Sequence, residues 1–454
     1  MKQLIYIIIC TALVSSCSIY RKYERPEGLP TDSLYRDNPA AAGNDTSSFG
    51  SMPWQELFQD AHLQELISYG LENNRDMQVA MLRVDQARAG LAAARLAYIP
   101  SLSFSPQGAI QSAGGNTVKT YEIPVQASWE IDLFGKLTNT KRNAQAQLLQ
   151  QQAYQRAVRS QLIASIATGY YSLLMLDEQV NISQSNMEIW KEQIRTLEAR
   201  QKIGESNEYA VSQARASFYQ IEATHNDLMR RQRETENSLC TLLGMTSQPI
   251  SRGTLQEQQL PEQLKTGIPL RLLSNRPDVI QAEMALAAAY YSTNIARSAF
   301  YPSITLGGSA GWTNALGQAV SNPGGLILSA VASLAQPIFQ RGKLVSNLRI
   351  SKAEEEIARL NYKQTILDAG EEVNNALYAT ESSRRDLESH ELQQKQLERT
   401  VQTAELLYQT NNVTYLDVLT ARQSLLNAQL NVSSDRFTCL QSVISLYHAL
   451  GGGE

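Results

Sequence analysis

The sequence is poor in the residues that mark several common classes of protein. Two of its four cysteines, Cys240 and Cys439, lie far apart without C-x-x-C spacing, so neither a disulfide framework nor a zinc site is predicted. The four histidines are scattered without H-E-x-x-H spacing, which disfavours a metal site or a histidine general base. The net charge of −4, with no basic run interleaved with aromatics, excludes nucleic acid as an expected partner. We expect no cofactor.

The first seventeen residues contain the only marked apolar run near the N-terminus. Leu4 to Val14 follow Lys2 and are too few to span a bilayer, which is typical of a secretory signal. The tetrad VSSC at 14–17 resembles a bacterial lipobox, so we expect cleavage of residues 1–16 and lipidation of Cys17. An ordinary signal with a chance cysteine is the alternative. Ser18, in place of Asp, favours the outer membrane by resemblance to enterobacterial sorting. Residues 17–52 lack a period and predict an extended leader.

Proline is missing from long stretches with helical periodicity. Residues 135–204 contain none, and a continuous helix over them would measure roughly 100 Å. Gly204 and small polar residues then predict a turn and a shorter returning helix to residue 244. Heptad spacing predicts coiled-coil partners for the long helix; the seam residues are Ile166, Leu173, Leu176, Val180, Met187, Trp190, Ile194 and Leu197.

The chain contains an internal repeat. Gly135 and the two residues after it return at Gly342 with an offset of 207 residues (342 − 135), and Arg215 returns as Arg422 with the same offset. We expect two copies of helix, β-hairpin and long helix hairpin. Their predicted bounds are 53–251 for the first copy (hairpin 101–133, helices 135–244), 252–269 for a linker, and 270–454 for the second (hairpin 303–338, helices 342–451).

The segment YEIPVQASWEIDLFGK at 121–136 alternates apolar and polar residues, as do three other segments of the two hairpins. Alternation predicts strands with two different faces. An isolated hairpin is marginal in water, and in lipid strands must close into a barrel with apolar residues outward. Known barrels begin at about eight strands. We therefore expect several copies of the chain to contribute four strands each.

Together these features resemble the outer membrane factor family of TolC/OprM-like channels. The residues that carry the resemblance are Cys17, WQELFQDAHLQELI, NNRDMQVA, WEIDLFGK with its echo PIFQRGK, and YLDVLTARQSLLNAQ. The resemblance implies a mixed α and β fold, in which a homotrimer forms a twelve-stranded outer-membrane β-barrel continued by a periplasmic α-helical barrel. The resemblance implies that the protein is not an enzyme. It implies a passive exit channel of an RND-type tripartite efflux system, through which small molecules such as drugs leave the periplasm. The implied partners are a periplasmic adaptor (membrane fusion protein), an inner-membrane pump and outer-membrane lipid.

The resemblance also implies roles for residues at the helix tips and strand ends. Asp417 and Tyr408 align with positions at the gated periplasmic aperture, where three copies of Asp417 would form an acidic ring that favours cations. Relatives have a second acidic residue where this chain has Thr420, and a basic residue upstream where it has Val413. We therefore expect fewer polar contacts to hold the aperture closed than in those relatives. For Asp417 the alternative is a solvated carboxylate near a turn. The remaining implied sites are adaptor-docking tips at Gly204, Glu205, Ser206, Asn411, Asn412 and Val413, and strand-to-helix joints at Gly135 and Gly342.

Two other classes of function are open at this point. A periplasmic coiled-coil adaptor or scaffold lipoprotein would account for the helices and Cys17, but not for four two-faced strands. A hydrolase is suggested by the G-x-S-x-G string around Ser309. A nucleophile elbow requires a strand, a sharp turn and a helix, whereas this string lies inside an alternating segment.

Overall fold

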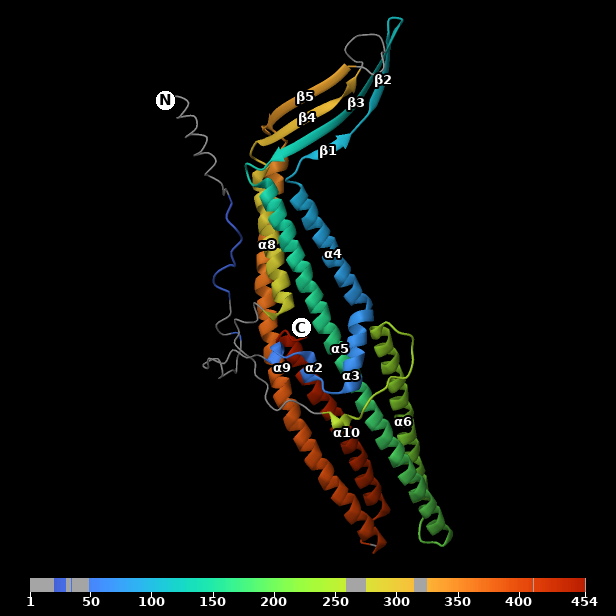
Figure 1. Ribbon diagram of the computed structural model, residues 1–454. Helices are drawn as coiled ribbons and strands as arrows, with labels where there is room; N and C mark the ends of the chain where they lie inside the picture. The colour runs from blue at the N-terminus through green and yellow to red at the C-terminus, as the bar shows by residue number, and fades with distance from the viewer. Residues whose placement is uncertain are drawn as a thin grey trace. The chain divides into compact units, whose positions relative to one another are not determined.

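A computed structural model describes residues 20–29, 34, 49–258, 275–313, 325–410 and 412–453 of the chain (Figure 1). The chain divides into two compact units. Each unit takes residues from both halves of the sequence, so neither unit corresponds to one predicted repeat. The first unit comprises Met1–Leu29, Leu82–Ala153 and Ile280–Thr365, and the second Pro30–Met81, Tyr154–Val279 and Ile366–Glu454.

The first unit contains one antiparallel sheet. Its order is β1-β3-β4-β5, and β2 pairs with β3 beyond the end of β1. β3 contains residues 121–131 of the strand expected over 121–133, and it begins earlier than expected, at Asn116. The strand bounds are Ser101–Phe104 for β1, Gln107–Ala113 for β2, Asn116–Ile131 for β3, Ser303–Thr313 for β4 and Gly325–Ala335 for β5.

The first arm of the N-terminal hairpin is divided into β1 and β2, where the sequence predicted one strand. Phe104 pairs with Val125 and Gln107 pairs with Glu122, so the register continues unchanged across the gap. That register sets Ser105 opposite Pro124 and Pro106 opposite Ile123. Proline has no N–H to donate to the ladder. Only the bond from Ser105 N to Pro124 O, at 3.4 Å, remains there, and the strand is interrupted without a shift.

The N-terminal leader lies against helices of the first unit. Residues 20–29 contain no helix or strand, whereas Phe49–Ser51, near the end of the segment expected as a leader, form the 3-10 helix η2. Arg25 forms a bidentate ion pair with Glu283 of helix α8 (Pro277–Ser298), at 2.8 and 2.7 Å. The amide of Tyr23 donates to the hydroxyl of Tyr291 at 3.2 Å. These contacts fix the leader through side chains and backbone together.

Helices make up most of the other described residues. α5 (Lys136–Lys202) and α9 (Lys343–Gln409) are each 67 residues long. They are followed by α6 (Glu208–Leu243) and α10 (Tyr415–Ala449). No helix in the described part of the chain is long and apolar enough to cross a membrane. The remaining elements are η2 (Phe49–Ser51), α2 (Trp54–Leu57), α3 (Ala61–Asn73), α4 (Arg75–Leu96) and η3 (Leu255–Glu257).

Six of the eight residues of the heptad seam predicted on α5 are buried in the second unit, and Val180 and Ile194 are half-buried. Ile166, Leu173, Trp190 and Leu197 are each at most 1% exposed. Residues seven apart lie on one face of a supercoiled helix, so burial of this set matches the predicted packing against other helices. The apolar period therefore predicted both the helix and its inner face.

Candidate functional site

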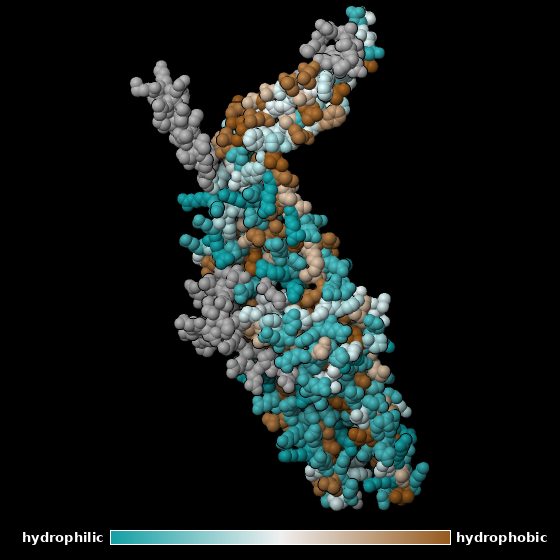
Figure 2. Space-filling view, viewed as in Figure 1, coloured by the Kyte–Doolittle hydropathy of each residue, from teal (hydrophilic) through white to brown (hydrophobic). Residues whose placement is uncertain are grey.

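The sheet separates apolar and polar residues onto opposite faces. Ile123 pairs with Trp312 and Trp312 pairs with Leu326, so one face carries rows of apolar side chains. Figure 2 shows hydrophobic residues gathered over the strands. An exposed apolar patch of this extent marks a surface that contacts lipid or protein. The exposed apolar residues of this face are Leu102, Phe104, Ile110, Ile123, Val125, Trp129, Leu306, Trp312, Leu326, Leu328 and Leu334.

The opposite face is rich in hydroxyl, amide and carboxylate groups. Gln126 pairs with Ser309, and Ser309 with Ser329. The hydroxyls of Ser309 and Ser329 are hydrogen-bonded at 2.7 Å. Ser309 thus lies in the middle of β4 and contacts a neighbouring strand, so the strand–turn–helix geometry of a nucleophile elbow is absent at this position. Val118 and Val331 are exposed apolar residues on this polar face.

Each long helix begins after a glycine in the left-handed region. Gly135 has φ +70° and Gly342 has φ +79°. A Cβ at Gly135 would lie 3.3 Å from Asn139 Nδ2 and 3.4 Å from Tyr20 Cδ2, whereas a Cβ at Gly342 would meet nothing within 4 Å. The two predicted strand-to-helix joints therefore share a backbone conformation but differ in their surroundings.

Polar contacts stabilise the first joint. Asp132 accepts hydrogen bonds from the amides of Leu137 (2.9 Å) and Thr138 (2.8 Å) at the start of α5. The first amides of a helix have no partner within the helix, so this carboxylate satisfies two of them. The rings of Phe134 and Tyr301 stack with centroids 5.0 Å apart.

The first helix-hairpin tip ends α5 with a Schellman motif. The amide of Glu205 donates to the carbonyl of Arg200 at 2.9 Å, and the amide of Gly204 donates to Gln201 at 3.1 Å. Gly204 has φ +83° and open space around its Cα, and Glu205 is exposed. The Asn207 side chain then accepts from Ala210 N at 2.9 Å and caps α6. The tip predicted at Gly204, Glu205 and Ser206 is thus a tight helix-to-helix turn.

The second tip has a related turn followed by a capping box. The amide of Asn412 donates to the carbonyl of Leu407 at 2.9 Å. Asn411 lies outside the described residues, and Val413 is half-buried. Thr414 is the N-cap of α10 and Asp417 is its partner at the third helical position. The T-x-x-D spacing is a local signal for a helix start, and this cap was not predicted from the sequence.

Asp417 is exposed, and its carboxylate is held by Thr414. It accepts from the hydroxyl at 2.6 Å and from the amide at 2.8 Å. These hydrogen bonds, the hydroxyl's first, lower the pKa of Asp417, so the carboxylate is ionised at neutral pH. Thr420 donates its hydroxyl to the carbonyl of Leu416 at 2.9 Å. The geometry gives Asp417 a role in starting α10 besides any role at an aperture.

Tyr408 lies at the apolar core between the two tips. Its ring contacts that of Tyr415, with centroids 5.5 Å apart, and the guanidinium of Arg200 lies 5.2 Å from the Tyr408 ring centre. This cation–π contact joins the ends of α5 and α9. The core cluster consists of Met187, Trp190, Leu197, Val211, Ala214, Ile221, Tyr415, Leu419 and Leu426. Among the described residues, no hydrogen bond or ring contact links Tyr408 to Asp417 or Thr420.

Corresponding ion pairs strengthen both helix hairpins. Arg215 of α6 pairs with Glu198 of α5 at 2.7 Å, and Arg422 of α10 pairs with Glu405 of α9. Both pairs are separated by the same number of residues along the chain (215 − 198 = 422 − 405 = 17). Each pair joins the outgoing and returning helix of its own hairpin.

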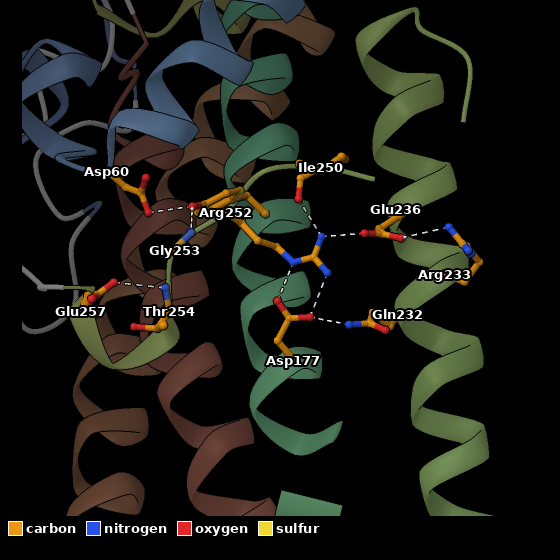
Figure 3. A network of polar contacts seen from close by, with 11 residues as sticks. Asp60, Asp177, Gln232, Arg233, Glu236, Ile250, Arg252, Gly253, Thr254 and Glu257 are labelled. Atoms are coloured by element: carbon orange, nitrogen blue, oxygen red, sulfur yellow. Dashed lines mark hydrogen bonds and ion pairs between the residues drawn. The ribbon is translucent and has the colours of Figure 1, made fainter. Parts of the chain in front are cut away.

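A partly buried polar network around Arg252 was not predicted from the sequence. Figure 3 shows the Arg252 guanidinium between two helices, bound to Asp177 of α5 (Nε to Oδ2, 2.5 Å) and Glu236 of α6 (Nη1 to Oε1, 2.6 Å). The hydrogen bond to Asp177 raises the pKa of Arg252, and the bond to Glu236 adds to this against the opposing effect of burial. Gln232 Nε2 also donates to Asp177 at 2.5 Å. Arg252 thereby ties the segment after α6 to both helices.

A second charged network surrounds Arg276. This guanidinium bonds Asp278 at 2.7 Å and Glu372 of α9 at 2.6 Å. Burial by itself would raise the pKa of Glu372, but hydrogen bonds from His448 and Arg276 and the charge of Arg276 outweigh it and lower the pKa to about 2. In the described part of the chain, no group of three or more His, Cys, Asp or Glu residues is arranged to hold a metal ion.

Two-faced strands that continue through glycine joints into 67-residue helices define a class of protein, the outer-membrane channels with a helical extension. The family model for outer membrane efflux proteins matches residues 66–245 and 268–452. The chain therefore belongs to the outer membrane efflux protein family.

Relatives agree with this assignment. The cation efflux system protein CusC of Escherichia coli K12 is 30% identical over 456 residues, covering 98% of each chain. The probable outer membrane lipoprotein SilC of Salmonella typhimurium is 28% identical, covering 97% of this chain and 96% of its own. The solved outer-membrane channel OprN superposes with a TM-score of 0.86 at 26% identity, covering 96% of this chain and 99% of its own.

The chain is thus an outer-membrane efflux channel of a tripartite system, located at the bacterial outer membrane and extending into the periplasm. Family membership decides against the adaptor or scaffold alternative. The family is a family of conduits and not of enzymes, which also removes support for a hydrolase at Ser309.

Proposed function

We propose that three copies of this chain form the exit channel. Each copy would contribute four strands to one closed twelve-stranded barrel, with β1 and β2 counted as one interrupted strand. The observation that carries the proposal is the sheet itself, which has an exposed apolar face, a polar face and two outer edges formed by β1–β2 and β5. In lipid, strand edges must be paired, and one sheet of this size is too small to close on itself. Pairing of β5 with the β1–β2 edge of the next copy satisfies both requirements.

We further propose that the chain consists of two repeats, at 53–251 and 270–454, with the linker at 252–269 between them. The equal length of α5 and α9 supports this proposal, as do the matching ion pairs of Arg215 and Arg422. In the trimer these helices would form a periplasmic α-helical barrel.

The helix-hairpin tips are proposed as the gated periplasmic end. The ring of Asp417, with Tyr408 and Thr420 nearby, would form the aperture. The exposed turns would receive the adaptor through Gly204, Glu205, Ser206, Asn411, Asn412 and Val413. Exposed apolar residues at both tips, such as Ile203 and Leu406, support a docking role, because they offer contact area that the described residues leave uncovered.

The proposed partners are a periplasmic adaptor and an inner-membrane pump that supplies the energy. The channel itself would be a passive conduit for small toxic molecules. CusC carries the word cation in its name, and we propose that the cargo here includes cationic compounds, since Asp417 is an ionised carboxylate.

Lipidation of Cys17 is proposed after removal of residues 1–16. Cys17 lies outside the described residues. Tyr20, three positions later, lies beside Gly135, which would bring an attached lipid within roughly 10 Å of chain length from the first joint. The name of SilC as a lipoprotein supports the proposal.

The test combines native mass spectrometry with conductance in planar bilayers. Protein extracted in detergent should have the mass of three chains plus lipid, and Cys17→Ser should remove the lipid mass without abolishing conductance. Protein that leaves membranes in salt alone, remains monomeric and does not conduct would refute the trimeric channel.

A further inference from the structure

Three carboxylates share the polar face of the sheet or its immediate continuation. Glu122, Glu130 and Asp132 occupy even-numbered positions of the β3 segment, and residues two apart along a strand point to the same side. In the proposed barrel this side faces the lumen. From the sequence alone the three carboxylates are equivalent, but the structure separates them by their partners.

Two of the three are already compensated. Asp132 accepts two amide hydrogen bonds and the Thr138 hydroxyl (2.6 Å) at the start of α5, where the helix N-terminus favours negative charge. Glu130 is paired with the ammonium of Lys136 at 2.8 Å. Neither contributes a free unit charge to the face.

Glu122 has only a neutral partner. Its Oε2 accepts from the side-chain amide of Gln107 at 3.0 Å across the β2–β3 pair. On its other side the register sets Thr313 opposite, which carries no charge. Among the described residues no cation is hydrogen-bonded to it or ion-paired with it. The carboxylate is therefore positioned by Gln107 without being neutralised.

The neighbouring positions on this face carry no charged group. Pro124 is next on the same side of β3, and it pairs with Gly311 on β4. The two backbones approach so closely that a Cβ at Gly311 would lie 2.3 Å from Ile123 O and 2.6 Å from Pro124 Cα. No side chain longer than glycine fits at 311, so that position cannot supply a group to shield or neutralise the carboxylate.

We propose that Glu122 is a charge-selecting residue of the channel interior, separate from Asp417. The proposal rests on the trimeric barrel. Three copies would form one ring of carboxylates at a single level of the lumen, where it attracts cations and cationic cargo and repels anions. Because ions screen such a ring, its effect is strongest at low salt.

The test is the reversal potential of reconstituted channels under a potassium chloride gradient. Glu122→Gln should lower the cation-to-anion permeability ratio by roughly twofold to eightfold at about 0.1 M salt, and less at 1 M. The matched control is the double variant Glu130→Gln/Lys136→Gln, which removes the same carboxylate type together with its cation. It leaves the net charge unchanged and should keep the wild-type ratio.

The outcomes separate this inference from the proposed function. Wild-type protein that does not conduct at all would refute the trimeric channel. A conducting wild type with the same reversal potential in Glu122→Gln would overturn only the role of Glu122, as would a control variant that shifts the ratio equally. Gln126→Glu, which adds a carboxylate on the same face, should raise the ratio. Measurable conductance in each variant shows that this variant folds and inserts.

Discussion

Replacement of the glycines at the two joints should destabilise the protein unequally. Gly135 (φ +70°) and Gly342 (φ +79°) both lie where a Cβ is unfavourable. An L-residue there costs about 1–2 kcal/mol from backbone strain. We expect Gly342→Ala to lower the free energy of unfolding by the backbone strain only, because its Cβ would meet nothing within 4 Å.

Gly135→Ala should lower the free energy of unfolding by about 1 kcal/mol more than Gly342→Ala does, since its Cβ adds a packing conflict. Asn139 Nδ2 at 3.3 Å and Tyr20 Cδ2 at 3.4 Å would have to shift. The measurement is denaturant unfolding of detergent-solubilised protein, followed by helical circular dichroism. Differences in midpoint at equal slope give the change in the free energy of unfolding.

A double-mutant cycle with Tyr20 isolates this packing contribution. In a Tyr20→Ala background, the cost of Gly135→Ala should fall towards that of Gly342→Ala, because one obstructing group is gone. The Gly342→Ala cost should not change in that background. Equal losses at both joints in the wild type, or no coupling between Tyr20 and Gly135, would refute the reasoning.

Three further predictions concern the second unit. Asp417→Asn keeps a capping acceptor and should lower only the cation preference of the channel, whereas Thr414→Ala should lower helix stability by about 1 kcal/mol and leave ion preference unchanged. Arg252→Met leaves the buried carboxylate of Glu236 and the half-buried carboxylate of Asp177 without their cation, and it should lower the free energy of unfolding by about 3 kcal/mol, which Arg252→Lys should not fully restore. Glu372 has its pKa lowered from 4.5 to about 2, so its stabilising effect is present above pH 4.5 and lost as pH falls towards 2; unfolding midpoints measured across that range should fall more steeply in the wild type than in Glu372→Gln.

Periodic patterns in the sequence predicted the elements of the fold. The alternation at 121–133 predicted β3, and the heptad seam that includes Ile166 and Trp190 predicted both α5 and its buried face. Both patterns are local, because the side-chain direction repeats every two residues in a strand and about every three and a half in a supercoiled helix. Such periods persist whatever the helix or strand packs against.

Contacts between distant residues explain what the sequence did not predict. Arg252 meets Asp177 and Glu236 only because two helices and the following segment converge, and none of the three lies in a recognisable motif. Glu236 offered one signal, since a charge at a buried position of α6 requires a partner. The division of the first arm likewise depends on register, which sets Ser105 opposite Pro124.

Corresponding positions in the two halves of the chain show the same limit of sequence similarity. Gly135 and Gly342 are followed by helices of equal length and share positive φ, so the common sequence at the joints specifies one backbone conformation. It does not specify what surrounds that backbone, because Tyr20 comes from the leader and packs on only one joint. The same holds for Glu122 and Glu130, which are identical residues on one face but differ in charge compensation through Gln107 and Lys136. Identity and period therefore predict conformation, whereas the energetic and electrostatic role of each residue depends on partners that only the folded chain brings to it.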